Sequence, residues 1–355
     1  MFQDPLIKIL LLPFSLLYGL GVSLRDFFYR RHLLMSVEFN VPVISVGNLS
    51  IGGAGKTPHI EYLIRLLDPY LDVATLSRGY RRNTQGFQIV NPWNTALESG
   101  DEPLMFKKKF GEVFVAVSES RSLGIPEILQ KHPSTQVILL DDAFQHRSVH
   151  PGLNILLTEY GQPFTRDFLM PSGRLREWRS AYQRADVIVV SKCPDDIGQE
   201  ERAALLAEIK PFPHQRLFFS SYHYLQPYYI LNPTYRLALT HDIEALLVCA
   251  IAGTAYLLEF LKEKLSAVRV QEFEDHHYFD TSDLDGIEQK FATMTGQKKL
   301  IITTEKDAMR LMLHRQWLLE KKLPVMVLPV EVNFHFGEQE AFDATVKDFL
   351  LNFKS

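Results

Sequence analysis

A glycine-rich turn followed by lysine and threonine is the most specific chemical signal in this sequence. It follows an apolar segment at 41–47 and comprises Ser50, Gly52, Gly53, Ala54, Gly55, Lys56 and Thr57. Glycines let backbone N–H groups surround phosphate oxygens, and the N-terminus of a following helix adds a favourable dipole. In such a loop the lysine reaches the β- and γ-phosphates, and the threonine hydroxyl binds Mg²⁺. Ser50 stands where the usual pattern has glycine, but the order of strand, turn and helix still predicts a nucleotide phosphate site.

A pair of aspartates at the end of another apolar segment provides the oxygen ligands that such a site needs. The segment QVILLDD at 136–142 ends in Asp141 and Asp142. Mg²⁺ prefers hard oxygen ligands beside the phosphates. Acidic residues also end strands for purely structural reasons, but beside a phosphate loop we predict that Asp141, Asp142 and Thr57 hold or orient the metal.

The elements that must position these residues alternate between strand-like and helix-like patterns. Strand-like apolar segments lie at 41–47, 72–78, 113–118, 136–142, 153–159, 186–192, 246–253, 299–307 and 325–332, and helical stretches at 58–68, 120–131, 200–210, 255–265 and 305–321. Continuous rather than alternating apolar residues indicate a parallel sheet that is buried on both faces. We therefore predict an α/β fold of the P-loop NTPase type, with a mainly parallel sheet and helices on both faces. A smaller α/β lobe is expected to follow, joined by a β-ribbon linker.

Length and composition are those of a globular protein with a sizeable core. The chain has 355 residues, which at about 150 residues per domain suggests two domains. An apolar fraction of 46% and a charged fraction of 23% exclude wholesale disorder and collagen-like repeats. A net charge of -4 gives no global basic field, so we predict no nucleic-acid partner, and nothing calls for an obligate protein partner. Two cysteines cannot build a disulfide framework or a four-thiolate zinc site.

The first 35 residues are the compositional exception. The segment 6–22 is apolar except for Lys8, contains Pro13, and is followed by arginines and aromatic residues. It lacks a good cleavage site for a secretory signal and falls slightly short of the length of a membrane span. An interfacial segment fits better, because apolar residues enter the acyl boundary and arginines meet anionic lipid. We predict a membrane-docking segment at 1–35; a core helix and a true span remain the alternatives.

The remainder of the chain is expected to contain three parts. A composition rich in proline and aromatic residues, with an antiparallel-type pattern, appears around 211–240. We predict a P-loop core domain at 36–210, a linker or β-ribbon at 211–240, and a smaller α/β lobe at 241–355.

Eight short motifs occur in order between residues 47 and 308. They are GNLSIGGAGKTP (47–58), LSRGYRR (76–82), SGDEP (99–103), DDAFQHR (141–147), PSGRLRE (171–177), VSKCPD (190–195), EDHHYF (274–279) and TTEKDA (303–308). Together they resemble the tetraacyldisaccharide 4'-kinase family, the lipid A 4'-kinases of Gram-negative bacteria. The phosphate loop of this family also carries serine at the position of Ser50, so that departure counts for the resemblance.

The resemblance implies a reaction whose demands can be compared with the residues. It implies transfer of the ATP γ-phosphate, with Mg²⁺, to the 4'-hydroxyl of an acylated glucosamine disaccharide 1-phosphate. The product would be lipid IVA, made at the cytoplasmic face of the bacterial inner membrane, on which the protein is peripheral. A sugar hydroxyl is a poor nucleophile and needs a positioned base. By resemblance the base is Asp101, paired with His276, with His277 as the alternative; Lys56 and Asp142 complete the catalytic set. A carboxylate–imidazole pair keeps the base ionised and oriented.

Further site residues follow from the resemblance. Arg121 and Arg176 are expected to clamp phosphate charge, because the guanidinium fork matches phosphate oxygens. Glu177 is expected to orient Arg176, and Glu102 to add a carboxylate beside the base. Lys192 is expected to pack on adenine, and the segment 303–307 to lie near the nucleotide base. The remaining predicted lining residues are Asn48, Tyr80, Gln145 and His146.

Two functions of other classes compete with this interpretation. The first is a P-loop GTPase or ATPase switch of the metallochaperone type, since VSKCPD loosely resembles a guanine-reading motif. In that motif, however, Ser191 replaces the usual asparagine or threonine, and Asp195 lies one residue too late. The second is a peripheral membrane module that binds nucleotide without catalysis. Nucleotide preference and lipid-dependent turnover separate these functions from a kinase.

Overall fold

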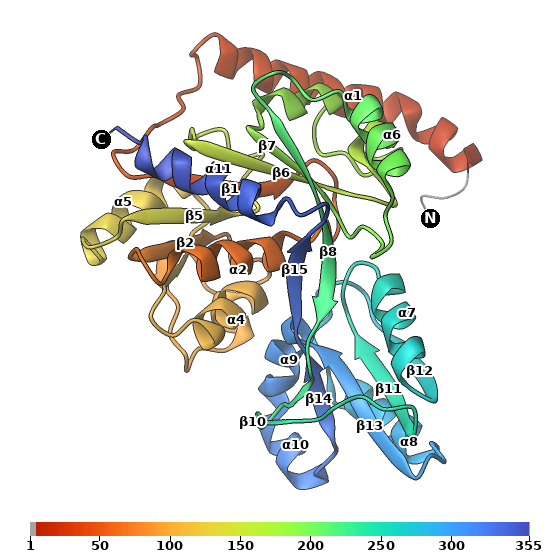
Figure 1. Cartoon of the computed structure of the whole chain (residues 1–355). Helices are drawn as coiled ribbons and strands as arrows, with labels where there is room; N and C mark the ends of the chain where they lie inside the picture. The colour runs from red at the N-terminus through yellow and green to blue at the C-terminus, as the bar shows by residue number, and fades with distance from the viewer. Residues whose placement is uncertain (1–4, 355) are drawn as a thin grey trace.

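Two β-sheets organise the residues that the computed structural model describes, which are residues 5–354 (Figure 1). The larger sheet has nine strands in the order β15-β8-β7-β6-β1-β5-β2-β4-β3. Pairing is parallel from β8 to β4, and only the edge strands β3 and β15 are antiparallel. The strands are β1 (Val43–Asn48), β2 (Val73–Ser77), β3 (Gln88–Ile89), β4 (Phe114–Val117), β5 (Val137–Asp141), β6 (Leu153–Glu159), β7 (Val187–Ser191), β8 (Arg216–Tyr224) and β15 (Val330–Phe334).

Helices cover both faces of the larger sheet because successive side chains of its strands point to opposite faces. Ile44 packs in the same core cluster as Ile60 and Ile64, which lie on one of these helices, α2. On the other face Val43 packs with Ile125 and the other apolar residues of a second helix, α5. The helices of this lobe are α1 (Pro5–Arg30), α2 (Lys56–Leu67), α3 (Ala96–Ser99), α4 (Asp101–Lys109), α5 (Arg121–Lys131), α6 (Gln199–Ile209) and α11 (Gln339–Leu351).

The smaller sheet has six strands in the order β10-β9-β14-β13-β11-β12. Strands β11, β12, β13 and β14 pair in parallel, and β9 and β10 add an antiparallel edge. The strands are β9 (Tyr228–Tyr229), β10 (Asn232–Arg236), β11 (Ile243–Cys249), β12 (Ala267–Glu272), β13 (Lys298–Thr304) and β14 (Val325–Leu328). The helices of this lobe are α7 (Ala255–Lys264), α8 (Thr281–Ala292), α9 (Glu305–Leu311) and α10 (Arg315–Lys321). The predicted fold class, a mainly parallel α/β sheet with a smaller α/β lobe, is confirmed.

The chain passes between the lobes twice, and this differs from the predicted division at 211–240. Strand β8 extends the larger sheet beside β7, and β15 then returns from the smaller lobe to pair with β8 (Figure 1). The C-terminal helix α11 also packs on the larger lobe, where Phe342 contacts Phe218 of β8. The smaller lobe therefore lies between β8 and β15 rather than extending over 241–355. Without β15, strand β8 would be an edge strand with unpaired backbone groups. Pairing with β15 covers this edge, which favours the return of the chain.

Helix α1 lies along the larger lobe at the end remote from the smaller lobe (Figure 1). Pro13 lies inside the helix without ending it. Hydrogen bonds from the Ser15 hydroxyl to the Leu169 carbonyl (3.0 Å) and from the Tyr18 hydroxyl to the Arg176 carbonyl (2.8 Å) hold one side to the 164–178 loop. The opposite side exposes large apolar residues, namely Ile9, Leu10, Phe14, Leu16, Leu17, Leu20, Leu24 and Phe27.

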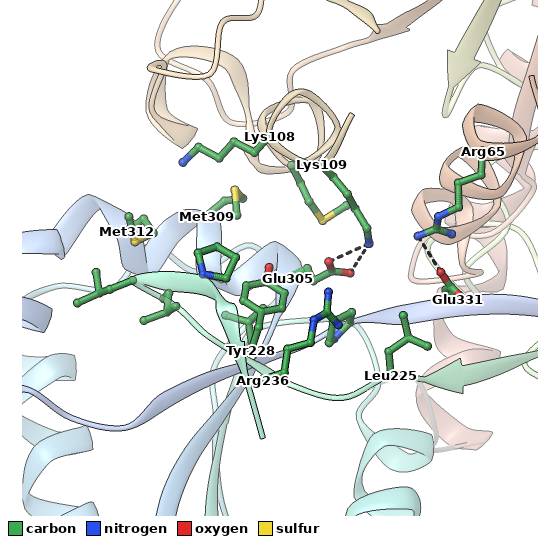
Figure 2. A pocket seen from close by; sticks show the side chains of 17 residues that line it. Arg65, Lys108, Lys109, Leu225, Tyr228, Arg236, Glu305, Met309, Met312 and Glu331 are labelled. Carbon is green, nitrogen blue, oxygen red and sulfur yellow. Dashed lines mark hydrogen bonds and ion pairs between the residues drawn. The ribbon is translucent and has the colours of Figure 1, made fainter. Parts of the chain in front are cut away.

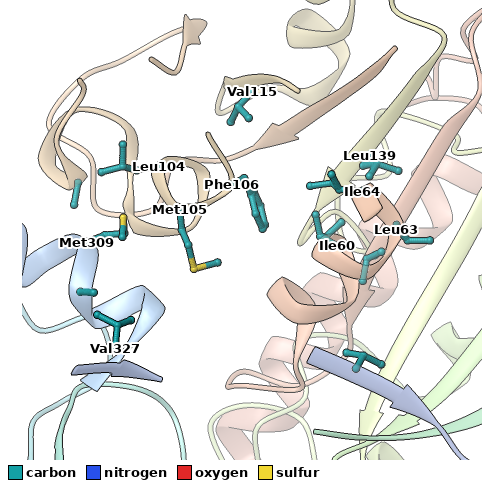
Figure 3. Packing of buried hydrophobic residues seen from close by; sticks show 14 of the residues in the cluster. Ile60, Leu63, Ile64, Leu104, Met105, Phe106, Val115, Leu139, Met309 and Val327 are labelled. Atoms are coloured by element: carbon teal, nitrogen blue, oxygen red, sulfur yellow. The ribbon is translucent and has the colours of Figure 1, made fainter. Parts of the chain in front are cut away.

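The two lobes share a hydrophobic seam where α4 of the larger lobe faces α9 of the smaller lobe. Figure 3 shows Met105 of α4 lying opposite Met309 of α9 and Val327 of β14. These residues belong to the same buried cluster as Phe106 and Ile60, which lie on the larger lobe. Because the α4–α9 seam is apolar along its middle, the polar residues at its two ends are held at fixed positions.

Candidate active site

The phosphate loop joins the end of β1 to the start of α2. Gly52 and Gly55 have φ angles of 116° and 84°, a left-handed conformation that favours glycine. A side chain at Gly55 would also collide with the hydroxyl of Tyr222. Nζ of Lys56 lies 3.1 Å from Oδ1 of Asn48 and 3.7 Å from Oδ1 of Asp142. The ammonium is therefore held between the loop and the end of β5, as a phosphate-binding lysine requires.

Asn48 is the centre of a polar network beside this loop. Its backbone carbonyl accepts hydrogen bonds from Nε2 of Gln145 (2.9 Å) and from an Nη of Arg176 (2.8 Å). The same guanidinium binds both carboxylate oxygens of Asp142, at 2.8 and 3.1 Å. Ser50 pairs through its backbone with Leu175, which brings the PSGRLRE segment onto the loop. Three of the motifs that are distant in sequence thus meet at the carboxyl end of β1.

Asp141 and Asp142 end β5 in different electrostatic environments. Burial, together with the nearby carboxylates of Glu102 and Asp142, raises the pKa of Asp141 to about 7. Burial also acts to raise the pKa of Asp142, but Lys56 and Arg176 outweigh it and hold this pKa well below its usual range. Oδ1 of Asp141 is buried without a hydrogen-bond partner among residues 5–354. Such an oxygen beside a second carboxylate suits a hard divalent cation.

Asp101 begins α4 at the same edge of the sheet. Gly100, with φ of 90°, packs directly against Gly79, where a Cβ on Gly100 would lie 3.1 Å from the Gly79 Cα. Gly79 follows β2, which is adjacent to β5, so the start of α4 lies beside the Asp141 strand end. Oδ2 of Asp101 lies 3.3 Å from Nδ1 of His276, which comes from the smaller lobe. The two lobes thus contribute one residue each to a carboxylate–imidazole pair.

The surroundings of Asp101 favour its ionised form. Only 1% of the residue is exposed, and this burial acts to raise its pKa. The ammonium of Lys306 and the hydrogen bond to His276 act in the opposite direction and hold the pKa well below its usual range. For Glu102, by contrast, burial and the neighbouring Asp101 raise the pKa. Adjacent carboxyl groups with opposite shifts are typical of sites that handle protons.

His276 has a left-handed backbone and is fixed by residues of the LSRGYRR motif. Its φ is 59°, uncommon for a residue other than glycine, and such conformations concentrate at functional sites. The ring of Tyr80 lies edge-on to the imidazole with centroids 4.8 Å apart, and an Nη of Arg81 donates to the His276 carbonyl. The alternative histidine, His277, lies 2.7 Å from Asp283 through Nε2 and is engaged at the start of α8.

Several predicted residues lie near the site but have other partners than expected. Glu177 binds Arg25 and Arg184 rather than Arg176. Arg121 is completely buried and donates to the Ser118 and Asp141 carbonyls, so it supports the backbone at the end of β5.

Two further predicted residues lie apart from the Asp101–His276 pair. Lys192 is 5% exposed and its Nζ lies 3.0 Å from Glu159. His146 is half-buried, and burial together with Arg121 lowers its pKa to about 4.

The contacts of the TTEKDA segment with the smaller lobe's His276 and with Glu102 were not predicted from the sequence. Thr303 to Asp307 were expected beside the nucleotide base. In the structure, Nζ of Lys306 lies 3.1 Å from Nε2 of His276 and 2.8 Å from Oε1 of Glu102. Arg310, in the same helix, is fully buried with its Nε 3.5 Å from Oδ2 of Asp101. The charged residues of TTEKDA were the only sequence feature that pointed to a polar role. The contact between the lobes, which the sequence does not show, brings them to the Asp101–His276 pair.

A cavity of about 490 Å³ lies at the other end of the α4–α9 seam, and Figure 2 shows the residues around it. Its wall is apolar at Tyr228 and Met309, and its rim carries Lys108, Arg236 and the Lys109–Glu305 ion pair. Of the residues predicted for the nucleotide, the metal and the base, only Glu305 of the segment 303–307 lines it. The cavity therefore belongs to the junction between the lobes.

Comparisons with known proteins cover nearly the whole chain. A family model for tetraacyldisaccharide-1-P 4'-kinase matches residues 7–351. The chain is 43% identical over 345 residues to a tetraacyldisaccharide 4'-kinase of Bacteroides thetaiotaomicron, covering 94% of this chain and 90% of that protein. It is 40% identical over 347 residues to one of Flavobacterium johnsoniae, covering 97% and 98%. The solved structure of "apo" form LpxK from Aquifex aeolicus in complex with ATP has a TM-score of 0.73 and 28% identity, covering 97% of this chain and 99% of that chain.

Proposed function

This chain belongs to the tetraacyldisaccharide-1-P 4'-kinase family, and from that premise we propose which of its residues carry the reaction. Its function is that of a tetraacyldisaccharide 4'-kinase in lipid A biosynthesis, with ATP as phosphate donor. The acceptor is the 4'-hydroxyl of tetraacyldisaccharide 1-phosphate, and the product is lipid IVA. The observation that carries the residue assignment is that Asp101, paired with His276, lies at the same sheet edge as the phosphate loop.

The phosphate loop binds the triphosphate and stabilises the charge that moves during transfer. Backbone N–H groups from Ser50 to Thr57 and the N-terminus of α2 face the phosphates, and Lys56 contacts the transferred group. Arg176 is fixed by Asn48 and Asp142 at 2.6–3.1 Å, so its guanidinium is already oriented when the anionic substrates arrive. Preorganised cations stabilise developing charge without a reorganisation cost at the moment of reaction.

Asp101 acts as the base that accepts the proton of the 4'-hydroxyl. The hydroxyl oxygen bonds to the γ-phosphorus while the bond from that phosphorus to the β–γ bridging oxygen breaks and ADP leaves. His276 orients the carboxylate through its Nδ1. A carboxylate that stays ionised in a buried position is available as acceptor at every physiological pH.

Mg²⁺ fits the carboxylates at the end of β5. Asp141, Asp142 and the Thr57 hydroxyl would hold it, and the unpartnered buried oxygen of Asp141 is the observation in favour. When bound, the ion neutralises charge on the β- and γ-phosphates. Removal of Mg²⁺ by a chelator is expected to abolish transfer.

The exposed side of α1 docks on the cytoplasmic face of the inner membrane. The helix from Ile7 to Arg30 has a mean hydropathy of 1.9 in its most apolar window, of which 17% is buried. Polar contacts from Ser15 to Ser23 tie its other side to the loop that carries Arg176 and Trp178, which supports a peripheral helix over a spanning one. The same loop brings the membrane surface, where an acylated substrate resides, next to the phosphate site.

A phosphate-transfer assay from ATP to tetraacylated disaccharide 1-phosphate tests the assignment of Asp101. Asp101→Ala is expected to lower turnover by about 10²–10⁴-fold while ATP binding persists. His277→Ala is the matched control, because the neighbouring imidazole is engaged with Asp283. Near-normal turnover in Asp101→Ala would remove Asp101 as the base and leave the family membership intact.

Vesicle flotation tests the docking surface. Leu20→Glu on α1, where the leucine is 67% exposed, is expected to lower the membrane-bound fraction. The matched control is Leu351→Glu at the end of α11, where the leucine is 83% exposed. Equal flotation of the two variants refutes the assignment of α1 as the docking helix.

A further inference from the structure

The ammonium of Lys306 lies inside a cluster of groups that all favour a cation. One ligand atom each from Asp101, Glu102 and His276 lie within 4.8 Å of one another. Nζ of Lys306 lies 2.8 Å from Oε1 of Glu102 and 3.1 Å from Nε2 of His276. The side chain of Lys306 is only 19% exposed, so these contacts are made largely away from water. A buried ammonium is thus the cation of this cluster.

This contact determines which nitrogen of His276 carries the hydrogen. An ammonium has three N–H donors and no acceptor, so Nε2 of His276 must accept from Lys306. The neutral ring then carries its hydrogen on Nδ1, which faces Oδ2 of Asp101 at 3.3 Å. Lys306 therefore selects the one neutral tautomer that donates to Asp101.

The N-terminus of α9 is fixed so that Lys306 points at His276. Asp307 accepts from the Ala250 backbone N–H (3.2 Å) and from the Thr304 hydroxyl (2.7 Å). Arg310 donates to the carbonyls of Ala250 and His277, both at 3.1 Å. The helix that carries Lys306 is thus bonded to the end of β11 and to the loop that carries His276.

We propose that Lys306 is a positioning residue for phosphoryl transfer, which fixes the His276 tautomer and thereby orients Asp101 as the acceptor of the hydroxyl proton. This inference rests on the proposed function, in which Asp101 is the base. Lys306 acts through His276 and Asp101 and does not itself take the proton.

The charges around Lys306 support its role in setting the ionisation of Asp101. Burial raises the pKa of Asp101, and Lys306 makes the largest contribution that lowers it. For Lys306 itself, burial lowers the pKa, but Glu102 and Asp101 outweigh it, so the ammonium stays protonated. The titratable and charged groups that face Lys306 are Asp101 and Glu102 from α4, Asp275 and His276 from the loop after β12, and Asp307 and Arg310 from α9.

The test is the pH dependence of transfer by the full chain with Lys306→Met. The thioether side chain keeps most of the volume and removes the charge. We expect kcat to fall about 10²-fold while KM for ATP stays within about threefold, because only the orientation at the base is lost. Loss of the ammonium raises the pKa of Asp101, so the acid limb of kcat/KM should move to higher pH. Lys321→Met is the matched control, since Lys321 forms an ion pair with Glu288 on the surface of the same lobe.

The outcomes separate this inference from the proposed function. Combining Lys306→Met with Asp101→Asn should lower turnover no further than Asp101→Asn alone, because both act through one group. If Asp101→Asn is nearly inactive but Lys306→Met keeps the wild-type kcat and acid limb, the role of Lys306 is wrong and Asp101 remains the base. If Asp101→Asn retains turnover, the base assignment itself fails.

A measurement on the unmodified protein removes any dependence on how the variant folds. Two-bond ¹H–¹⁵N spectra of the full chain with ¹⁵N-labelled histidine report the tautomer of each ring, and His276→Gln identifies the signal. We expect neutral His276 with its hydrogen on Nδ1 at pH 7.5. A hydrogen on Nε2, or on both nitrogens, overturns the proposal.

Discussion

The two ends of the α4–α9 seam carry similar ionic groups in different settings. At one end the site cluster consists of Asp101, Glu102, His276 and Lys306, and at the other the seam cluster consists of Glu61, Lys109 and Glu305. Each cluster has a lysine between acidic groups, and each joins the larger lobe to the smaller one. Lys109 lies 2.7 Å from Glu61 and 2.8 Å from Glu305, so α2, α4 and α9 meet at one ammonium.

The difference lies in what each cluster faces. The site cluster lies beside the strand ends that carry the phosphate loop and contains His276 with its left-handed backbone. In the seam cluster the charges pair with one another, and the neighbouring cavity is lined by apolar residues such as Met105 and Met309 (Figure 2). Buried ion pairs such as those of the seam cluster hold helices and strands in fixed positions. The site cluster is instead arranged around the proposed proton acceptor, Asp101. In the proposed function, one helix pair thus serves catalysis at one end and lobe assembly at the other.

Replacing the buried carboxylate at each end is the strongest test of this comparison. Asp101→Asn is expected to lower turnover per folded molecule by about 10²–10⁴-fold, because the base is lost. Glu61→Gln is the matched variant, since Glu61 is also a buried carboxylate beside a lysine. Its turnover should stay within about threefold of wild type. Steady-state transfer assays on both variants decide the matter, and equal losses would show that the two ends act as one unit.

Removing the lysine of the seam cluster should affect stability instead of turnover. Lys109→Met leaves Glu61 and Glu305 without their shared partner, and breaking a buried pair in this way costs about 3–5 kcal/mol. The free energy of unfolding from urea titration measures this loss. Turnover per folded molecule is expected to stay near that of wild type, because the contacts of Asp101 at the other end are unchanged. A large fall in kcat without a loss of stability would contradict the division.

Strands and the phosphate loop were predictable from the sequence because their signals are local. The continuous apolar segments from 41 to 192 all became buried strands of the larger sheet, and Lys56 begins α2 directly after the glycines. Helix α4 was not predicted, since DEPLMFKKK is short and resembles a solvated turn. It is helical because its apolar residues pack against α9, a contact between segments about 200 residues apart. A short helix of this kind takes its stability from packing rather than from propensity.

The candidate site could be predicted where a residue lies within a single strand–loop motif. It could not be predicted where residues from different lobes meet. Lys56 and Asp142 follow directly from strand ends. The contact of Lys306 with His276 depends on the return of α9 to the larger lobe, and the partners of Glu177 depend on how α1 and Arg184 lie beside it. The direction of a side chain in an irregular segment depends on its tertiary contacts, which only the fold supplies.

The pH dependence of stability should distinguish the seam cluster from the site cluster. Burial, partly offset by Lys109, raises the pKa of Glu61 from 4.5 to about 7. Between these values the folded chain keeps a proton on Glu61 that the unfolded chain has released, so stability is lost as the pH rises through this window. We expect wild type to lose about 2 kcal/mol more than Glu61→Gln between pH 5 and 7.5. If the free energy of unfolding changed equally with pH in the two proteins, Glu61 would be ionised throughout this pH range.

The smallest effect is expected for the ion pair at the rim of the cavity, between Arg65 and Glu331 (Figure 2). Its atoms are 3.4 Å apart, and both side chains are about one-third exposed, so water and salt screen the attraction. Glu331→Gln should therefore cost less than about 1 kcal/mol in the free energy of unfolding, and 1 M NaCl should remove the difference. A cost as large as that of Lys109→Met would mean that the pair at the rim joins the lobes as strongly as the buried cluster does. In that case, burial could not be the reason why the seam cluster contributes more to the free energy of unfolding than an exposed ion pair.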